Sequence, residues 1–147
     1  MLFTLSFLGL LAPAHPAAPV AWSFEAHAQK DGVVLVELLA KVEDGWHLYA
    51  TTLPSAGGPL PTIFRFTPSN SYAIVGELQE PAPVEEYDAN FGMLVRHHSG
   101  EPRFVLAIEP SGGTPFVVEG ELEYMVCNEK TCLPPVTVPF RIAVPTT

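Results

Sequence analysis

Apolar and polar residues alternate along most of the chain after Val20, in short runs that glycine, proline, aspartate and asparagine interrupt. Alternation with a period of two is typical of strands that bury one face, and turn residues about every 8 to 12 positions are typical of a β-sandwich. The pattern predicts strands near residues 20–29, 33–43, 46–50, 62–67, 72–76, 93–98, 103–109, 115–126 and 136–143. We therefore expect an all-β fold, an immunoglobulin-like antiparallel β-sandwich.

The strand expected over 33–43 has the clearest pattern. Its core face holds only apolar residues, namely Val34, Val36, Leu38, Ala40 and Val42. Its other face mixes apolar residues with Glu37 and Lys41. Asp31-Gly32 precedes this strand and favours a tight turn, so we expect the first two strands to pair as a hairpin.

Two long connections are expected between the strands. Residues 53–61 are rich in proline, glycine and serine, which predicts a loop. Residues 80–86 combine prolines with glutamates, which predicts an extended acidic connector. The sequence has no internal repeat and no long low-complexity tract, so we expect a single domain after the N-terminal segment.

Composition supports one packed domain. Hydrophobic residues make up 48% of the 147 residues and charged residues only 16%. This apolar content is enough to form a buried core without stabilising disulfides or metals. The 16 prolines favour short strands and loops over long helices. The net charge is −9, and the seven lysines and arginines are scattered singly, so binding to nucleic acid or to anionic lipid is not expected.

The N-terminal residues 1–18 are expected to be a secretory signal peptide. Residues 1–11 are apolar, and the alanines and prolines that follow place a cleavage site after Ala14. The apolar run is shorter than the roughly 20 residues that span a bilayer. No lysine or arginine precedes it, whereas a signal peptide usually begins with a positively charged segment. The alternative interpretation of these residues is a disordered apolar tail. With a signal peptide, residues 19–147 form an exported domain, in the periplasm or another exported location.

The chain has two cysteines, Cys127 and Cys132, on either side of a short turn. Cys127 shares the alternation parity of the glutamates at 119, 121 and 123, so we expect it to face outward. Closing so short a loop stabilises a fold by only about 2 kcal/mol, whereas an accessible disulfide can be attacked by a partner thiolate. The spacing leaves three alternatives open: a redox-active pair, a structural clip, or a pairing by metal or chance.

A zinc site is not expected, although the chain has five histidines. No histidine lies within five residues of a cysteine, and His97 and His98 are neighbours on one predicted strand and so point to opposite faces. A Ser-His-Asp triad, a P-loop and a dinucleotide-binding motif are absent from the sequence as well. Hydrolase chemistry therefore has no support.

Four segments together resemble the N-terminal periplasmic domain family of the thiol:disulfide interchange protein DsbD. They are the cysteine hairpin 124–135, the segment 44–49, the segment 57–62 followed by Phe64 and Phe66, and the segment 85–92. The similarity spans residues 20–144. It implies an immunoglobulin-like fold and a redox-active disulfide as the only redox group, with no metal or other cofactor. The cysteine loop holds four residues, slightly fewer than in better-known members.

The resemblance also implies roles for individual residues. Cys132 matches the cysteine that attacks the partner disulfide, and Cys127 matches the one that resolves the mixed disulfide. His47 and Tyr49 would lie beside the disulfide, although the family commonly has tyrosine where this chain has His47. The simpler interpretation of these two is a surface histidine and an ordinary half-buried aromatic residue.

Residues 85–92 resemble the cap loop that covers the cysteines in this family. Tyr87 is the first choice for the covering ring and Phe91 the second. The carboxylates of Glu85 and Glu86 would disfavour a second negative charge and so keep a thiol protonated. The alternative is a solvated acidic loop.

Two functions follow as hypotheses. The first is an exported protein-disulfide reductase component that relays electrons to thioredoxin-like exported partners. The family's parent proteins add a transmembrane electron-delivering domain and a thioredoxin-like domain, so here a membrane protein would deliver electrons in trans unless the chain is a fragment of a longer protein. The second hypothesis is a secreted, non-enzymatic binding module with a structural hairpin disulfide.

Overall fold

The computed structural model describes residues 18–145, and all helical or sheet structure in this range is β-strand. The strands are β1 Val20–Ala28, β2 Val34–Val42, β3 His47–Tyr49, β4 Ile63–Phe66, β5 Tyr72–Gln79, β6 Val84–Asp88, β7 Met93–His98, β8 Arg103–Pro110, β9 Phe116–Tyr124, β10 Val126–Cys127 and β11 Val136–Val144. The described residues contain no helix long and apolar enough to cross a membrane. The expected signal peptide lies almost wholly outside this range.

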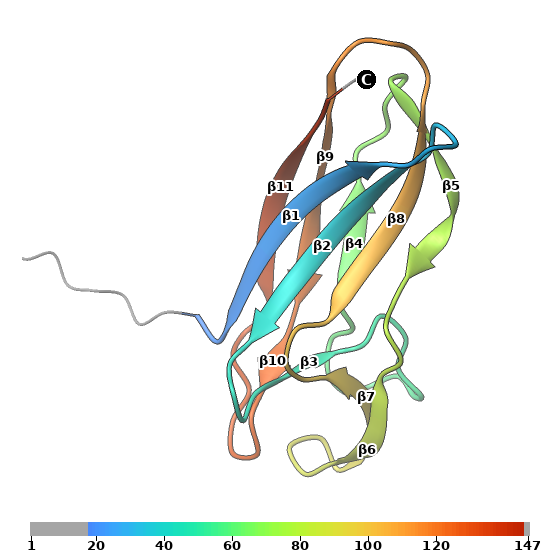
Figure 1. The fold of residues 1–147 in the computed structure, drawn as a ribbon. Helices are drawn as coiled ribbons and strands as arrows, with labels where there is room; N and C mark the ends of the chain where they lie inside the picture. Colours follow the sequence, from blue (N-terminus) through green and yellow to red (C-terminus); the bar gives the residue numbers. More distant parts are fainter. Residues whose placement is uncertain (1–17, 146–147) are drawn as a thin grey trace, which may run out of the picture.

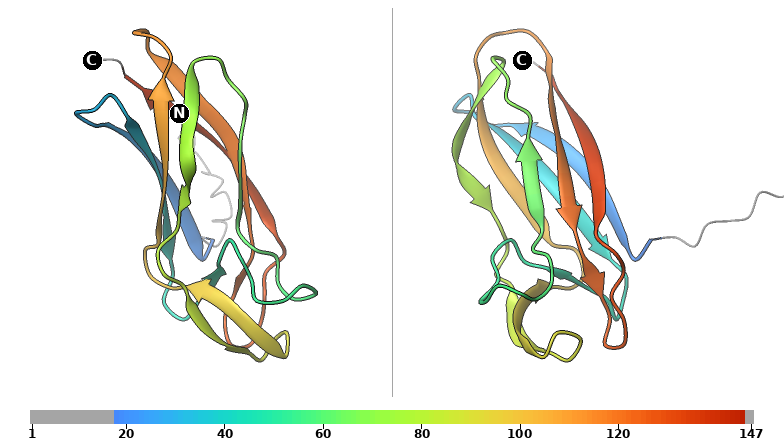
Figure 2. Two further views of the ribbon diagram at one scale, coloured as in Figure 1. Left: turned by 90° about the vertical axis from the view of Figure 1, so that its right-hand side faces the viewer. Right: turned by 180° about the vertical axis from the view of Figure 1, so that it is seen from behind.

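Two antiparallel sheets form the body of the molecule (Figure 1). One sheet has the strand order β1-β2-β8-β5, and the other has the order β11-β9-β4. The rear view in Figure 2 shows β4, β9 and β11 as a layer in front of the first sheet. The expected immunoglobulin-like sandwich is therefore confirmed.

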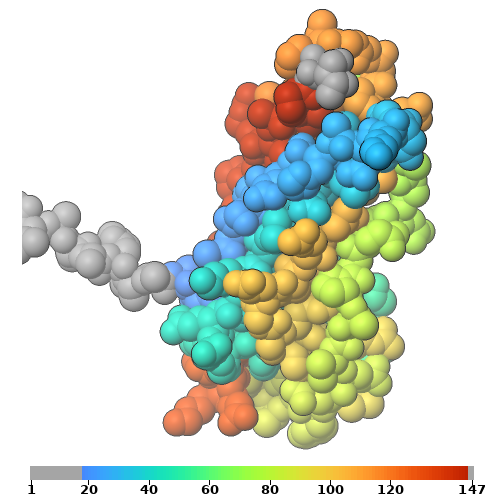
Figure 3. Space-filling model, in the orientation of Figure 1, coloured from blue at the N-terminus to red at the C-terminus, as the bar shows by residue number. Residues whose placement is uncertain are grey.

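A third, smaller sheet closes one end of the sandwich. Its strand order is β10-β3-β7-β6. The small sheet lies at the end of the molecule opposite to the C-terminal end of β11 (Figure 1). Figure 3 shows the cysteine loop and the β6–β7 residues at this same end. This small sheet brings together the residues discussed below.

The core lies between the two large sheets. Its fully buried side chains include Leu48 of β3 and, from β2, β8 and β9, Val36, Leu38, Phe104, Ile108, Val118 and Leu122. The alternation expected in β2 is confirmed, because every second residue from Val34 to Val42 is buried. Each buried valine, leucine, isoleucine or phenylalanine contributes roughly 1.5–3 kcal/mol, whereas closing the cysteine loop contributes only about 2 kcal/mol.

The first hairpin turn is also confirmed. Gly32 has a φ of 84°, a conformation that glycine adopts without strain. The Asp31 carboxylate accepts a hydrogen bond from the Val33 backbone N–H at 3.1 Å. β1 and β2 then pair along their whole lengths.

Three expected boundaries were wrong. Residues 80–86 are not simply a connector, because β6 begins at Val84 and pairs with β7. β5 runs past 76 to Gln79 through an irregularity in its pairing with β8. The strand expected over 115–126 is interrupted at Met125, since β9 pairs with β11 and β4 whereas β10 pairs with β3. In each case long-range backbone pairing, which local alternation does not encode, sets the boundary.

Candidate active site around the disulfide

Cys127 and Cys132 form a disulfide across a tight loop. Asn128 builds this loop, because its side-chain oxygen accepts hydrogen bonds from the backbone N–H groups of Lys130 and Thr131 at 2.9 and 2.8 Å. Its own backbone N–H donates to the Thr131 carbonyl. Asparagine favours such turns because its side chain mimics a backbone acceptor.

The two sulfurs differ in environment. Cys127 is 0% exposed, whereas Cys132 is half-buried. The expectation that Cys127 faces outward was therefore wrong. The alternation of β9 ends at Met125, and Val126 and Cys127 are both buried in β10 after the chain changes sheets. Cys132 is thus the more accessible cysteine.

The strand β3 supplies the residues beside Cys127. His47 is the direct antiparallel partner of Cys127, and cross-strand partners place their side chains on the same face of the sheet. Tyr49 lies two residues further along β3, on the same face, and is fully buried. The structure therefore places both residues next to the disulfide, as the sequence resemblance implies.

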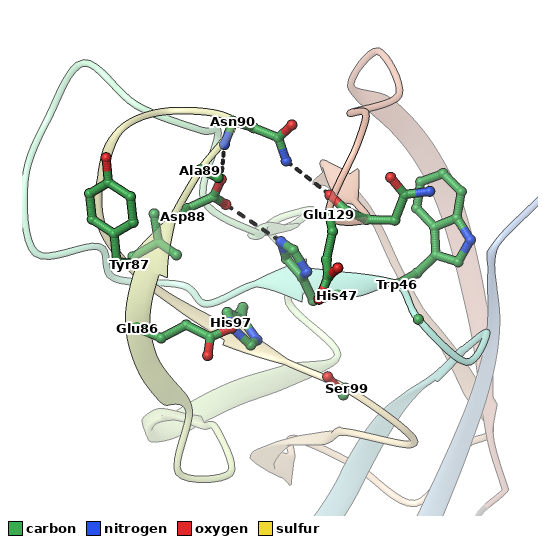
Figure 4. A pocket seen from close by; sticks show the side chains of 13 residues that line it. Trp46, His47, Glu86, Tyr87, Asp88, Ala89, Asn90, His97, Ser99 and Glu129 are labelled. Carbon is green, nitrogen blue, oxygen red and sulfur yellow. Dashed lines mark hydrogen bonds and ion pairs between the residues drawn. The ribbon is translucent and has the colours of Figure 1, made fainter.

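Asp88 joins these two side chains. The Tyr49 hydroxyl donates to Asp88 Oδ2 at 2.5 Å, and His47 Nε2 lies 3.2 Å from the Tyr49 oxygen and 3.5 Å from Asp88 Oδ2. The Asn90 backbone N–H donates to Asp88 Oδ1 at 2.8 Å. Figure 4 shows Asp88 with His47 and Asn90 at the rim of a pocket. Sequence reasoning treated Asp88 only as part of an acidic loop.

Burial and hydrogen bonding set the charges of this group. Burial raises the pKa of Tyr49, and its hydrogen bond to Asp88 raises it further, so the phenol remains a donor. Burial would raise the pKa of Asp88, but the hydrogen bonds from Tyr49 and the Asn90 backbone outweigh that effect and lower it. Burial, followed by the nearby His97, lowers the pKa of His47. At neutral pH, Asp88 is thus ionised and His47 is uncharged.

His97 is a further member of the site that sequence reasoning did not place there. Its ring lies 4.5 Å from the His47 ring, and its Nε2 lies 2.5 Å from the Glu86 carboxylate. Its Nδ1 is buried without a hydrogen-bond partner among the described residues. His98 points to the other face of β7 and binds Glu80 at 2.7 Å, so the expected opposite orientation of the two histidines is confirmed.

Phe91, and not Tyr87, packs against the buried cluster that contains Cys127. Phe91 lies edge-on to Tyr49 with ring centres 6.1 Å apart, whereas Tyr87 is 66% exposed. A cluster of apolar residues surrounds the disulfide: Tyr49, Leu53, Phe91, Met93, Val95, Met125, Cys127 and Cys132. The first choice of Tyr87 was wrong because residues 84–88 are a strand. Tyr87 pairs with Leu94 on the outer face of β6. The loop that covers the disulfide begins only after Asp88, where β6 ends.

The same alternation separates the two glutamates of this segment. Glu86 shares the inner face of β6 with Asp88, and its carboxylate lies 2.5 Å from His97 Nε2. Glu85 lies on the outer face, where it binds Arg96 at 2.9 Å. Of the two, only Glu86 lines the pocket beside the disulfide.

A pocket of about 500 Å³ adjoins the cysteine loop. Its polar lining includes His47, Glu86, Asp88, His97 and Glu129, and none of its lining residues is a lysine or an arginine. The Asn90 side chain donates to the Asn128 carbonyl at 2.9 Å and so connects the cap to the cysteine loop (Figure 4).

Potential metal ligands converge elsewhere. Within residues 18–145, Glu25, His27 and Glu37 are the only three such groups that meet, on the outer face of β1 and β2. Glu37 is already paired with Arg103 at 3.1 Å. This group lies apart from both cysteines.

The comparisons with known proteins agree with this geometry. Residues 14–143 match the family described as thiol:disulfide interchange protein DsbD, N-terminal. No curated protein sequence matches the chain.

Three solved structures share the fold. The reduced DsbD N-terminal domain of Neisseria meningitidis is 21% identical, with 85% of this chain and 86% of that chain covered and a TM-score of 0.54. The chain matched in the complex between the DsbD N-terminal and PilB N-terminal domains of the same species is 22% identical. The match covers 90% of this chain and 86% of that chain, with a TM-score of 0.51. The N-terminal periplasmic domain of ScsB from Proteus mirabilis is 17% identical, with a TM-score of 0.60. The match covers 93% of this chain but 51% of that chain, so this chain spans about half of the ScsB domain.

Proposed function

The chain belongs to the family of DsbD N-terminal domains, and on this premise we propose that it is an exported thiol–disulfide exchange domain that relays electrons through Cys127 and Cys132. The observation that carries the proposal is the disulfide itself. It closes a loop with a sequence separation of 5 at one end of the sandwich, outside the main core. Such a clip adds only about 2 kcal/mol, so stabilisation is a weak reason for its presence.

The unequal burial of the sulfurs supports unequal roles. Cys132, the more accessible cysteine, attacks the partner disulfide, and its sulfur forms the mixed disulfide while one partner thiolate leaves. Cys127 then attacks Cys132 and releases the second partner thiolate. Two electrons pass to the partner, both partner thiolates take up protons, and the Cys127–Cys132 bond is restored.

The cap controls access to these sulfurs. Phe91 packs on the cluster that contains both cysteines, and Gly92 follows it with a φ of 65°. The cap must move before a partner cysteine can reach Cys132. The closed cap therefore protects the reduced pair from unrelated oxidants.

Thioredoxin-like exported proteins are the proposed electron acceptors, and the periplasm is the proposed location. The likeness to a periplasmic ScsB domain and to a DsbD domain in complex with PilB supports both points. The proposed electron donor is a membrane electron-delivering protein, in trans or in the same polypeptide.

The reduction potential tests this function. The oxidised protein is equilibrated in dithiothreitol buffers of graded potential, and free thiols are counted by alkylation and mass spectrometry. We expect a midpoint near the thioredoxin value of about −270 mV. A midpoint below about −300 mV would instead favour a structural clip and a non-enzymatic binding module.

Trapping tests the assignment of the two cysteines. Cys127→Ala leaves Cys132 free to attack but removes the resolving thiol, so a covalent complex with an exported thioredoxin-like protein should accumulate on non-reducing gels. Cys132→Ala should trap little. Equal trapping by both variants would contradict the assigned roles.

A further inference from the structure

We propose that His47 is the base that accepts the proton of the Cys127 thiol when this sulfur resolves the mixed disulfide. The proposal rests on the exchange function above and assigns a residue to one of its steps. It starts from the place of His47, which is the direct cross-strand partner of Cys127. Their Cβ atoms are expected about 4.5–5.5 Å apart, because this spacing is general for antiparallel partners.

Cys127 needs such a base because of its surroundings. It is 0% exposed and packs with Tyr49 and Val95, and burial in an apolar cluster raises a thiol pKa. The thiolate, however, is the form that attacks a disulfide. No lysine or arginine lines the adjoining pocket, whereas Glu86 and Asp88 both do. A neutral imidazole, which becomes positive on accepting the proton, offsets these negative charges at the moment the thiolate forms.

The hydrogen bonds around His47 fix the nitrogen that can act. The Tyr49 hydroxyl donates its proton to Asp88, so its oxygen is an acceptor for His47. His47 Nε2 lies 3.2 Å from that oxygen and therefore carries the ring hydrogen. This leaves the lone pair on Nδ1, and no hydrogen bond from a described residue occupies it. Asp88, at 3.5 Å from Nε2, is placed to stabilise the imidazolium once Nδ1 is protonated.

The other groups that face His47 keep it ready to accept a proton. They are Tyr49 on β3, Asp88 and Glu86 on β6, His97 on β7, and Cys127 with the nearby Glu129 on the cysteine hairpin. Burial and His97 lower the pKa of His47, so the ring is uncharged at neutral pH. Glu86 holds His97 against His47 through its bond to His97 Nε2.

The step balances as follows. In the mixed disulfide, the Cys127 proton moves to His47 Nδ1, and the Cys127 thiolate attacks Cys132 Sγ. The Cys127–Cys132 bond forms while the bond between Cys132 and the partner sulfur breaks. The partner sulfur leaves with the bonding electron pair as a thiolate, and the proton passes from His47 to it or to solvent. A tyrosine at this position, the residue that the resemblance associates with the family, could not accept a proton at neutral pH.

Stopped-flow reaction of the reduced protein with 5,5′-dithiobis(2-nitrobenzoate) separates the two sulfur steps. The first thionitrobenzoate release reports attack by Cys132, and the second reports resolution by Cys127. We expect His47→Phe to slow the second release about tenfold at pH 7, which corresponds to about one pKa unit in the thiol, and to leave the first unchanged. The difference should shrink as the pH rises further, because more of the Cys127 thiol is then ionised without a base.

His98→Phe is the matched control, because His98 is also a buried histidine paired with a carboxylate but lies on the other face of β7. Both releases should keep their wild-type rates in this variant. Equal slowing of both releases by His47→Phe, or slowing of neither, would overturn the proposal. His47→Gln, which keeps a hydrogen-bond donor but is no base, replaces His47→Phe if that variant fails to fold.

A direct titration keeps this result separate from the exchange function. In Cys132→Ser, thiolate absorbance at 240 nm measures the pKa of Cys127 without any partner. Adding His47→Phe should raise that pKa by about one unit. An unchanged pKa overturns the role of His47, whereas failure to trap a partner alongside a raised pKa would count against the proposed function only.

Discussion

Phe91 is the cap residue that packs against the cluster around the disulfide. Its ring lies edge-on to Tyr49, which is buried beside Cys127, whereas Tyr87 points outward from β6. Phe91→Ala should therefore speed alkylation of the reduced protein by iodoacetamide several-fold, since it uncovers the sulfurs. Tyr87→Ala is the matched control and should leave the rate within twofold of wild type. Faster alkylation in Tyr87→Ala than in Phe91→Ala would contradict the prediction that Phe91 covers the sulfurs.

Buried ionisable residues near the site make stability depend on pH. Burial would raise the pKa values of Glu80 and Asp88, but hydrogen bonds, from His98 and Thr51 to Glu80 and from Tyr49 and Asn90 to Asp88, outweigh it and lower both values in the folded protein. The unfolded chain therefore binds protons first, and their contribution is lost as pH falls below about 4.

His47 causes a further loss of stability on acidification, which begins at a higher pH than the loss from the two carboxylates. Its folded pKa is lowered from 6.5, so the unfolded state takes up a proton first as pH falls below that value. The unfolding free energy of the oxidised protein should thus begin to fall near pH 6.5 and fall again below about pH 4. Urea denaturation across this range measures it. His47→Phe should flatten the upper part, and an unchanged slope there would contradict the lowered pKa.

At the scale of elements, β9 packs so closely against β4 and β11 that position 120 has no room for a side chain. A Cβ built on Gly120 would clash with the Arg65 backbone oxygen of β4 and with the Phe140 ring of β11. Backbone cannot yield as a flexible side chain can, so Gly120→Ala should cost about 1–3 kcal/mol of unfolding free energy. Gly113→Ala, where a Cβ meets nothing within 4 Å, should cost little. Chemical denaturation compares the two, and equal values would contradict the packing.

The small sheet β10-β3-β7-β6 shows how elements build the site. β3 places His47 and Tyr49, β6 places Glu86 and Asp88, β7 places His97, and β10 places Cys127. Each contributing strand is short, and the Asn90–Asn128 hydrogen bond connects the cap to the cysteine loop. The site therefore depends on pairing between strands far apart in the sequence.

For the whole molecule, the core and the disulfide are separable. The main apolar core lies between the two large sheets and does not contain the cysteines. The double variant Cys127→Ala, Cys132→Ala should therefore keep the fold and lose only about 2 kcal/mol. Circular dichroism and urea denaturation measure this, and global unfolding of the variant would favour a structural disulfide instead.

The sequence by itself determined the fold class and most of the strands. Period-two alternation is a local signal, so β2 and its buried face could be identified without any knowledge of strand partners. The short spacing of the cysteines and the surrounding motifs also identified the hairpin and the family. His47 and Tyr49 could be placed on one face for the same local reason.

Only the tertiary structure decided which residues meet. Cys127 is buried because the chain changes sheets at Met125, which reverses the parity that β9 predicts. Tyr87 faces outward because β6 pairs with β7, and this leaves Phe91 to cover the disulfide. Asp88 and His97 join His47 through the same pairing. Strand partners and register depend on hydrogen bonds between distant segments, and local alternation carries no information about them.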